Sequence, residues 1–328
     1  MFDLIGDIHG YATPLRGLLA RLGYRERGGV WSHPERRVIF LGDFVDRGPE
    51  QVEVVRIARA MVEAGYALAV MGNHEFNAVI WATPDPSRPG EMLRRHSPKH
   101  RRQHQAYLDQ VGEGSPLHRD HIAWFRTLPL YLDLPGLRVV HACWHPPSLE
   151  TLASRLDDEG RIPPAAWPDL VREGSAPLEA LETLLKGLEV ELPTGYEFLD
   201  KDGNPRRRVR TRWWELDRLT YRDLALVPPE AIEEIPHEPI PGDVLPGYEG
   251  SKPLFVGHYW LTGTPRPLTP HIACLDYSIA ASHASHSEGG SKLCAYRWDG
   301  EEQLQADHFV WVTPYALSEN CLRSPIRR

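Results

Sequence analysis

Five short apolar segments, each followed at once by a glycine or a histidine, constrain the fold of this chain more than any other feature of its sequence. They occupy residues 2–5, 38–41, 67–71, 137–140 and 254–256. Short continuous apolar segments are typical of strands buried on both faces of a largely parallel sheet. Helices are predicted between the first three, at residues 13–22, with Thr13 as N-cap and Pro14 at the first helical position, and at residues 49–64. Residues 1–80 therefore predict a βαβαβ unit.

A different pattern begins near residue 270. Three closely spaced strands are predicted at residues 274–279, 293–298 and 308–312, and the glycine-containing turns between them indicate an antiparallel meander. The stretch 146–250 is rich in proline and charge and shows one clear helical pattern, at residues 177–188. We interpret this stretch as an insertion or cap within a single domain covering residues 1–328, because residues on both sides of it belong to one predicted site.

Composition excludes several classes of protein. The 328 residues are 41% hydrophobic and 25% charged, which indicates a folded globular protein. The net charge of −8 argues against general nucleic-acid or anionic-membrane binding. Four cysteines without a CxxC pair indicate neither a disulfide framework nor a cysteine-based zinc site. The N-terminus has no signal-peptide pattern and no apolar run could cross a bilayer, so we expect a cytoplasmic location.

Polar side chains follow all five apolar segments. They are Asp7 and His9 after the first, Asp43, Asp46 and Arg47 after the second, Asn73 and His74 after the third, His141 after the fourth and His258 after the fifth. In an open α/β sheet the carboxyl ends of the strands share one edge, where ligands bind. Oxygen and imidazole ligands without a thiolate suit Mn²⁺, Fe or Zn²⁺. The pattern therefore predicts a metal site at the strand ends.

The sequence blocks that carry these residues resemble a known family. GDIHG (6–10), GDFVDRGP (42–49), GNHE (72–75), His141 and GH (257–258) are similar to the motifs of the calcineurin-like metallophosphoesterases. GDxVDRG followed by GNHE resembles the phosphoprotein phosphatase branch, which includes protein Ser/Thr phosphatases and bacterial diadenosine-polyphosphate hydrolases. The resemblance implies an α/β metallophosphatase fold, in which two facing mixed β-sheets are flanked by helices.

The resemblance also implies a role for each residue. Two divalent metal ions are expected, Mn²⁺ first and Fe or Zn²⁺ as alternatives. The expected ligands are Asp7 and His9 for one ion, Asn73, His141 and His258 for the other, and Asp43 as the bridge. The expected catalytic residues are His74, which would protonate the leaving oxygen, Asp46, which would orient His74, and Arg47, which would hold phosphate oxygens.

Two basic segments leave alternatives open. The family's second phosphate-binding arginine has no secure counterpart, and Arg210 and Arg212 are candidates by composition. The arginines at 206–212 precede Trp213 and Trp214, so this segment either binds a polyphosphate and a stacked base or forms a basic strand with core tryptophans. A helix predicted from Ser97-Pro98 to residue 111 carries basic residues at 99–104, which form either a solvated face or a rim that collects anions.

Three functions are compatible with these features. The first is a hydrolase of phosphate monoesters, phosphoprotein Ser/Thr phosphate included, that uses a hydroxide activated by the dinuclear centre. The alternative is a nucleotidyl hydrolase that cleaves diadenosine polyphosphates. The third is a non-catalytic metal- or phosphate-binding protein. The expected partner is accordingly a phosphorylated substrate, either a phosphoprotein or a nucleotide, and the oligomeric state stays open.

Overall fold

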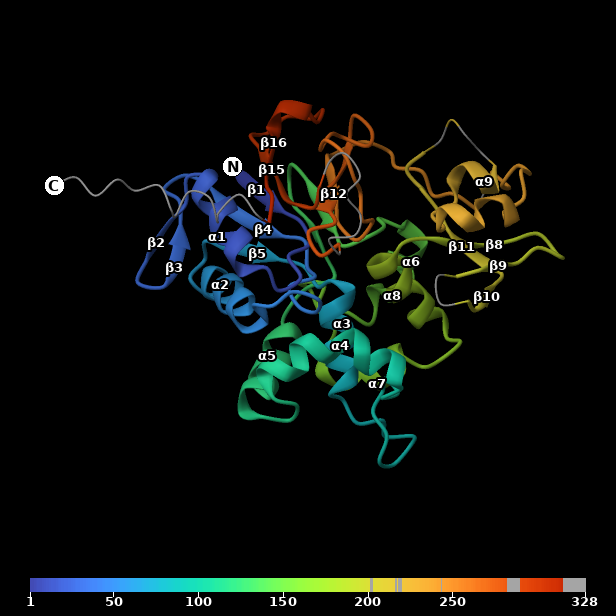
Figure 1. The fold of residues 1–328 in the computed structure, drawn as a ribbon, viewed down its shortest axis with the longest axis horizontal. Coiled ribbons are helices and arrows are strands. Elements are labelled where there is room, and N and C mark those ends of the chain that lie inside the picture. The colour runs from blue at the N-terminus through green and yellow to red at the C-terminus, as the bar shows by residue number, and fades with distance from the viewer. Residues whose placement is uncertain (201–202, 216, 218–219, 243, 282–289, 315–328) are drawn as a thin grey trace.

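Two mixed β-sheets form the centre of the computed structural model, which describes residues 1–200, 203–215, 217, 220–242, 244–281 and 290–314 (Figure 1). The six-stranded sheet comprises β1 (Phe2–Ile5), β4 (Arg37–Phe40), β5 (Ala67–Ala69), β14 (Asp276–Tyr277), β15 (Lys292–Trp298) and β16 (Phe309–Val312). The four-stranded sheet comprises β6 (Tyr131–Asp133), β7 (Arg138–Val140), β12 (Leu254–Val256) and β13 (Ile272–Cys274). All five predicted apolar segments thus form strands, namely β1, β4, β5, β7 and β12.

Each sheet combines parallel and antiparallel pairs. In the order β14–β15–β1–β4–β5, strands β1, β4 and β5 are parallel, β15 runs antiparallel to β1 and β14, and β16 also pairs with β15. In the order β13–β12–β7–β6, only β6 is antiparallel to its neighbour. The parallel β1–β4–β5 core confirms the predicted βαβαβ unit.

The two sheets face each other across a shared apolar core. One cluster of buried side chains contains members of both sheets, among them Leu4, Ile39 and Tyr296 from the first and Val139, Phe255 and Ala273 from the second. The outer faces are covered by helices, so strand residues such as Phe40 and Val256 belong to a second buried cluster with helical residues such as Leu18. The predicted arrangement of two facing mixed sheets flanked by helices is confirmed.

The remaining elements surround these sheets. The helices are α1 (Ala12–Arg21), α2 (Gln51–Glu63), α3 (Asn73–Trp81), α4 (Pro98–Val111), α5 (Pro116–Phe125), α6 (Pro146–Ala153), α7 (Trp167–Leu170), α8 (Ala176–Lys186) and α9 (Tyr221–Leu224), with short 3₁₀ turns η1 (Pro164–Ala166), η2 (Pro229–Glu234) and η3 (Ala306–His308). Three small antiparallel pairs are β2 (Arg25–Arg27) with β3 (Val30–Ser32), β8 (Glu189–Glu191) with β11 (Arg208–Arg210), and β9 (Phe198–Leu199) with β10 (Pro205–Arg206). None of the helices in the described part of the chain has the length and apolar character that spanning a membrane requires.

The first two helices begin at other residues than predicted. Helix α1 starts at Ala12, so Thr13 is not its N-cap. Instead the backbone N–H and the hydroxyl of Thr13 donate to the carboxylate of Glu50, at 2.8 and 2.7 Å. Helix α2 starts at Gln51, because the Gln51 side chain accepts from the Asp46 N–H at 2.7 Å and holds the preceding residues in a loop. A side chain distant in sequence replaces the local cap in the first case.

The predicted strand at residues 274–279 is wrong as a single element. Residues Ile272–Cys274 pair in parallel with β12, whereas Asp276–Tyr277 pair antiparallel with β15. The chain therefore passes from one sheet to the other at Leu275. The meander itself is limited to β14, β15 and β16, which are antiparallel as predicted.

The stretch 146–250 lies along one side of the molecule and contains α6 to α9 and β8 to β11 (Figure 1). Its apolar side chains, such as Leu181 and Val209, belong to the same buried cluster as the outer face of the sheets. The backbone N–H of Ala142 donates to the Leu184 carbonyl at 2.9 Å, which ties α8 to the end of β7. That this stretch is an insertion within one domain stays our proposal.

Candidate metal centre

The carboxyl ends of β1, β4 and β5 meet those of β7 and β12, so the site lies where the edges of both sheets converge. Backbone hydrogen bonds join the loops: the N–H groups of Ile8 and His9 donate to the Asp43 carbonyl at 3.0 and 2.8 Å, and that of Gly257 donates to the His141 carbonyl at 2.8 Å. The backbone N–H of His258 reaches the Asp7 carboxylate, 3.1 Å from Oδ2. A single sheet edge was expected; the structure uses two.

The loops approach each other too closely for side chains at two glycines. A Cβ atom on Gly72 would lie 2.2 Å from Asp43 Oδ1, and one on Gly257 would lie 2.1 Å from Asp7 Oδ1. Several site residues other than glycine have left-handed backbone angles, namely His9, Asp43, Asp46, Arg47, His258 and Trp260. Such conformations are unfavourable for residues with a Cβ and cluster at functional sites. The backbone is thus shaped to bring these side chains together.

His9, Asp7 and Asp43 form the first group of candidate ligands. His9 Nε2 is buried without a hydrogen-bond partner among the described residues, and it lies 3.9 Å from Asp7 Oδ2 and 3.7 Å from Asp43 Oδ2. Its Nδ1 is 3.1 Å from the Val45 carbonyl, to which it donates, so Nε2 keeps a free lone pair. Burial lowers the pKa of His9 to about 3, which leaves the imidazole neutral, as a metal ligand must be. An orphaned imidazole nitrogen between two carboxylates fits a cation.

The second group contains Asp43, His141, His258 and Asn73. His141 Nε2 lies 3.4 Å from Asp43 Oδ2 and 3.0 Å from Asn73 Oδ1, and His258 Nδ1 lies 2.8 Å from the same Asn73 oxygen. His141 Nδ1 donates to the Leu41 carbonyl at 2.7 Å, which orients the ring. Asp43 belongs to both groups. One ligand atom from each of Asp43, His141 and His258 lies within 4.8 Å of the others, and the same holds for His9, Asp43 and His74. These donors fit two cations that share one carboxylate.

The charges at this site also favour cations. Asp7, Asp43 and Asp276 are all buried beside one another. Burial raises the pKa of Asp7 well above its usual value, and the negative charge of Asp276 raises it further. Asp276 accepts from the Trp260 N–H at 2.9 Å and so fixes the loop after β12. Closely spaced carboxylates in a buried site repel one another unless positive charge is supplied.

His74 is held by a hydrogen-bonded chain of three side chains. Its Nδ1 lies 2.5 Å from Asp46 Oδ2, while Asp46 Oδ1 lies 2.7 Å from Nδ1 of His104. Burial opposes ionisation of Asp46, but contacts with His104 and His74 hold its pKa below the usual value. Burial lowers the pKa of His74, yet the charges of Asp43 and Asp46 leave it raised overall. Asp46 therefore orients a His74 ring whose Nε2 faces Asp43, 3.9 Å from Oδ2.

His104 was expected on a solvated or anion-collecting face, and this expectation is wrong. Helix α4 begins after Ser97, as predicted, but His104, Tyr107, Leu108 and Val111 form its buried side. Their i, i+3, i+4, i+7 spacing is the signal that could have identified His104 as an inward-facing residue. Its contact with Asp46 could not be read from the sequence.

Glu75 is a second residue whose role was missed. It is fully buried, and its carboxylate accepts from the backbone N–H groups of Asp43 and Phe44, both at 2.8 Å, and of Gly72 at 3.1 Å. It therefore clamps the loop after β4 onto the start of α3. The motif GNHE thus includes a structural carboxylate beside the candidate ligand Asn73.

The candidate phosphate-binding arginines differ in whether they reach the site. Arg47 is exposed and its guanidinium carbon lies 4.3 Å from the centre of the Trp260 ring. Arg210 reaches the site, with Nη1 3.2 Å from His258 Nε2 and Nη2 3.2 Å from Glu189 Oε1. Arg212 does not, because its Nη1 donates to the Asp223 carbonyl at 3.2 Å.

Trp213 and Trp214 are both buried, and Trp213 Nε1 donates to the Tyr259 hydroxyl at 2.8 Å. The reading of these residues as core tryptophans is therefore correct, and neither presents a face for base stacking. The exposed aromatic side chain at the site is Trp260, with 37% of its surface accessible.

Comparison with known proteins identifies a family and several relatives. Residues 1–155 match the family model of the calcineurin-like phosphoesterases. Relatives include the asymmetrical bis(5'-nucleosyl)-tetraphosphatase PrpE of Halalkalibacterium halodurans, 45% identical over 74 residues, and that of Oceanobacillus iheyensis, 28% identical over 141 residues. The alignments cover 22% and 43% of this chain and 30% and 54% of the two relatives, so the chain spans about half or less of their lengths. The resemblance to the family is confirmed for the N-terminal part of the chain.

Solved structures were compared with this chain as well. A protein serine/threonine phosphatase from Saccharomyces cerevisiae superimposes with a TM-score of 0.47 at 15% identity, covering 95% of this chain and 78% of that one. A cold-active protein-tyrosine phosphatase from a psychrophilic Shewanella species gives a TM-score of 0.46 at 17% identity, covering 93% of this chain and 80% of that one.

Proposed function

Because residues 1–155 match the calcineurin-like phosphoesterases, we propose that this chain is a metal-dependent hydrolase of phosphate esters or phosphoanhydrides. The observation that carries the proposal is the pair of ligand groups sharing Asp43 beside the His74–Asp46 pair. Two divalent cations at such a cluster acidify a water and stabilise the charge of an in-line displacement at phosphorus. Mn²⁺ is our first candidate, and Fe or Zn²⁺ are alternatives, because the donors are oxygen and imidazole.

The residues around the ligands supply what hydrolysis needs from the protein. Arg47, in the loop after β4, and Arg210, at the end of β11, lie at the cluster and present guanidinium groups that hold phosphate oxygens. His74 keeps Nδ1 on Asp46 and so directs Nε2, with its proton, toward the cluster, where it protonates the leaving oxygen. His104 supports Asp46 from the opposite oxygen and acts as a positioning residue.

The substrate class has two candidates. Phosphate monoesters, phosphoprotein phosphate included, need only the cations and the two arginines. Diadenosine polyphosphates are the second candidate, favoured because the relatives of this chain include bis(5'-nucleosyl)-tetraphosphatases. A cytoplasmic location and the absence of nucleic-acid and membrane partners stay predictions from the sequence.

A metal add-back assay tests the proposed function. The full chain is stripped with chelator and then assayed with para-nitrophenyl phosphate, a phosphoserine peptide and diadenosine tetraphosphate, with Mn²⁺, Zn²⁺ or Fe²⁺ restored singly. We expect hydrolysis to return with at least one metal, and the preferred substrate to separate the two classes. Metal binding without turnover of any of the three substrates would favour a non-catalytic binding protein.

Arg210 and Arg212 provide a matched pair for testing the phosphate grip. Arg210→Ala should lower kcat/KM about tenfold or more on every substrate, because one hydrogen bond to a charged group contributes about 1.5–3 kcal/mol. Arg212→Ala should change kcat/KM less than about twofold, since its guanidinium points to the Asp223 carbonyl. Steady-state kinetics with metal content measured in parallel checks this. Equal effects of the two substitutions would contradict the assignment of Arg210.

A further inference from the structure

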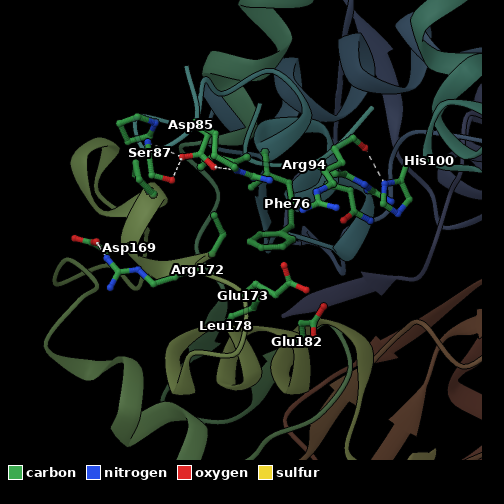
Figure 2. Close-up of a pocket in the computed structure, with 18 of the residues that line it drawn as sticks. Phe76, Asp85, Ser87, Arg94, His100, Asp169, Arg172, Glu173, Leu178 and Glu182 are labelled. Atoms are coloured by element: carbon green, nitrogen blue, oxygen red, sulfur yellow. Dashed lines mark hydrogen bonds and ion pairs between the residues drawn. The ribbon is translucent and has the colours of Figure 1, made fainter. Parts of the chain in front are cut away.

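A cavity of about 650 Å³ lies beside α3, next to the metal centre. Figure 2 shows Arg94 and Phe76 on one side of it and Leu178 and Glu182 of α8 on the other. Its walls come from helices α3, α4, α7 and α8 and from the loops before α4 and α8. The ligand-bearing strand ends are not part of its lining, so it is separate from the metal centre itself.

The cavity and the metal centre are adjacent along α3. Asn73, a candidate ligand, begins this helix, and Asn77, which lines the cavity, follows one turn later on the same side. One turn corresponds to about 5.4 Å along the helix axis. The cavity therefore begins about one helical turn from a candidate metal ligand.

Arg94 connects the cavity to the catalytic side chains through adjacent residues. Its Nη2 donates to Gln103 Oε1 at 3.2 Å, and the next residue on α4, His104, contacts Asp46. Burial lowers the pKa of Arg94, whereas the negative charge of Asp46 raises it. Arg94 is thus the cation of the cavity that lies toward His74 and Asp46.

Arg94 and Arg95 differ from the other cations of the cavity wall in having no carboxylate partner among the described residues, and of these two only Arg94 is partly buried. Arg88 is paired with Asp85 and Glu91, Arg172 with Asp169, and Lys186 with Glu182. Among the described residues, no Asp or Glu lies within ion-pair distance of Arg94. A partly buried guanidinium with spare donors and no carboxylate partner is available to bind an anion.

The rest of the cavity wall combines charged side chains, including Asp85, Asp169, Glu173 and Glu182, with an apolar part that suits an uncharged, flat group. Its apolar lining consists of Phe76, Ile80, Leu93, Val171 and Leu178. A second cavity of about 570 Å³ shares Leu178, Glu182 and Lys186 with the first and extends to Arg210. The two cavities are contiguous along α8 and are together called the groove; Arg94 lines the first cavity, and Arg210, which contacts His258, lines the second.

We propose that this groove binds the part of a nucleoside polyphosphate that lies beyond the attacked phosphorus, with Arg94 holding a distal phosphate and the apolar wall contacting the nucleoside. The inference rests on the proposed phosphoesterase function and names its substrate class. A phosphopeptide fits less well, because extended peptides commonly bind by adding a strand to a sheet edge, and the residues lining the Arg94 cavity belong to helices and loops. Polyphosphate selectivity is therefore assigned to Arg94 and not to Arg212.

Equilibrium binding tests the groove without relying on turnover. The full chain loaded with Mn²⁺ is titrated with β,γ-methylene-ATP, which resists cleavage at that bridge, and with inorganic phosphate. Arg94→Gln should raise the Kd of the nucleotide about tenfold or more and that of phosphate less than threefold. The control Arg172→Gln lines the same cavity but is already paired with Asp169, and it should change neither Kd more than twofold. Equal changes for both ligands, or for both variants, would overturn the proposal.

A second variant tests the groove independently in case Arg94→Gln does not fold. Leu178 lies on α8 and is only partly buried, so Leu178→Trp should fill the groove. It should weaken binding of the nucleotide but not binding of phosphate. In kinetic assays the ratio of kcat/KM for diadenosine tetraphosphate to that for a phosphopeptide should fall tenfold in Arg94→Gln. A decrease in kcat/KM for the phosphopeptide alone would identify a peptide-binding groove and overturn the proposal. If the wild type hydrolyses neither substrate, the proposed function fails, and the binding titration still decides whether the groove holds polyphosphate.

Discussion

Replacing His74 with asparagine should lower kcat by about 10²–10⁴-fold on alkyl phosphates, the range expected for loss of a general acid. The expectation follows from the hydrogen bond between His74 Nδ1 and Asp46 at 2.5 Å, which leaves Nε2 to carry the transferred proton. An asparagine side chain has no proton of suitable pKa at that position. The loss should be much smaller on para-nitrophenyl phosphate, because nitrophenolate leaves without protonation. Steady-state kinetics on the two substrates measures the difference.

Metal content distinguishes a general-acid role of His74 from a role as a metal ligand. His74, His9 and Asp43 together form a set of side chains that could hold one cation, so His74 is itself a potential ligand. If His74 is a general acid, the His74→Asn variant should keep both metals. If His74 is a metal ligand, the variant should lose one metal and hydrolyse both substrates more slowly by the same factor. His104→Asn provides a milder comparison, because it removes only the support of Asp46 Oδ1. We expect it to reduce kcat less than His74→Asn does, with the same dependence on the leaving group.

The parts of the fold that the sequence predicts are those determined locally. Helix α4 follows from Ser97 and Pro98, whose cap and first-turn roles depend only on neighbouring residues, and the Ser97 hydroxyl accepts from the His100 N–H at 3.2 Å as such a cap should. Helix α1 was misplaced because its first turn is satisfied by Glu50, which is 37 residues away from Thr13. Strand 274–279 was misread because nothing local shows that the chain changes sheets at Leu275.

In the candidate site, too, the features set by local sequence could be predicted and those set by tertiary packing could not. Motif spacing brings Asp7, Asp43 and Asn73 to one place because each directly follows a strand of a parallel core. The link between His104 and Asp46 joins residues 58 positions apart and depends on how α4 docks, which no motif encodes. Likewise Arg210 and Arg212 are two residues apart and would share one face of a continuous strand, but β11 ends at Arg210 and the Arg212 guanidinium contacts the Asp223 carbonyl instead of the site.

Asp43→Asn should remove both metal sites at once, with no measurable hydrolysis remaining. The reason lies in the hydrogen bond from the His74 backbone N–H to Asp43 Oδ1, at 3.0 Å. An asparagine keeps this bond by presenting its carbonyl oxygen there, which places its NH₂ group where Oδ2 stood. That position lies 3.7 Å from His9 Nε2 and 3.4 Å from His141 Nε2, within both ligand groups. A donor NH₂ in place of a carboxylate oxygen repels a cation from either side.

The matched control for this substitution is Asp46→Asn, which changes an equally buried carboxylate that contacts only imidazoles. Elemental analysis of reconstituted protein should find two metals per chain in the wild type and in Asp46→Asn, and fewer than one in Asp43→Asn. Thermal unfolding gives a second readout, because ligands that bind only the folded state raise Tm. The wild type should lose that increment in chelator, whereas Asp43→Asn should melt at the same temperature with or without metal. Two bound metals in Asp43→Asn would mean that the cations do not share this carboxylate, since no other Asp or Glu of the described residues belongs to both groups.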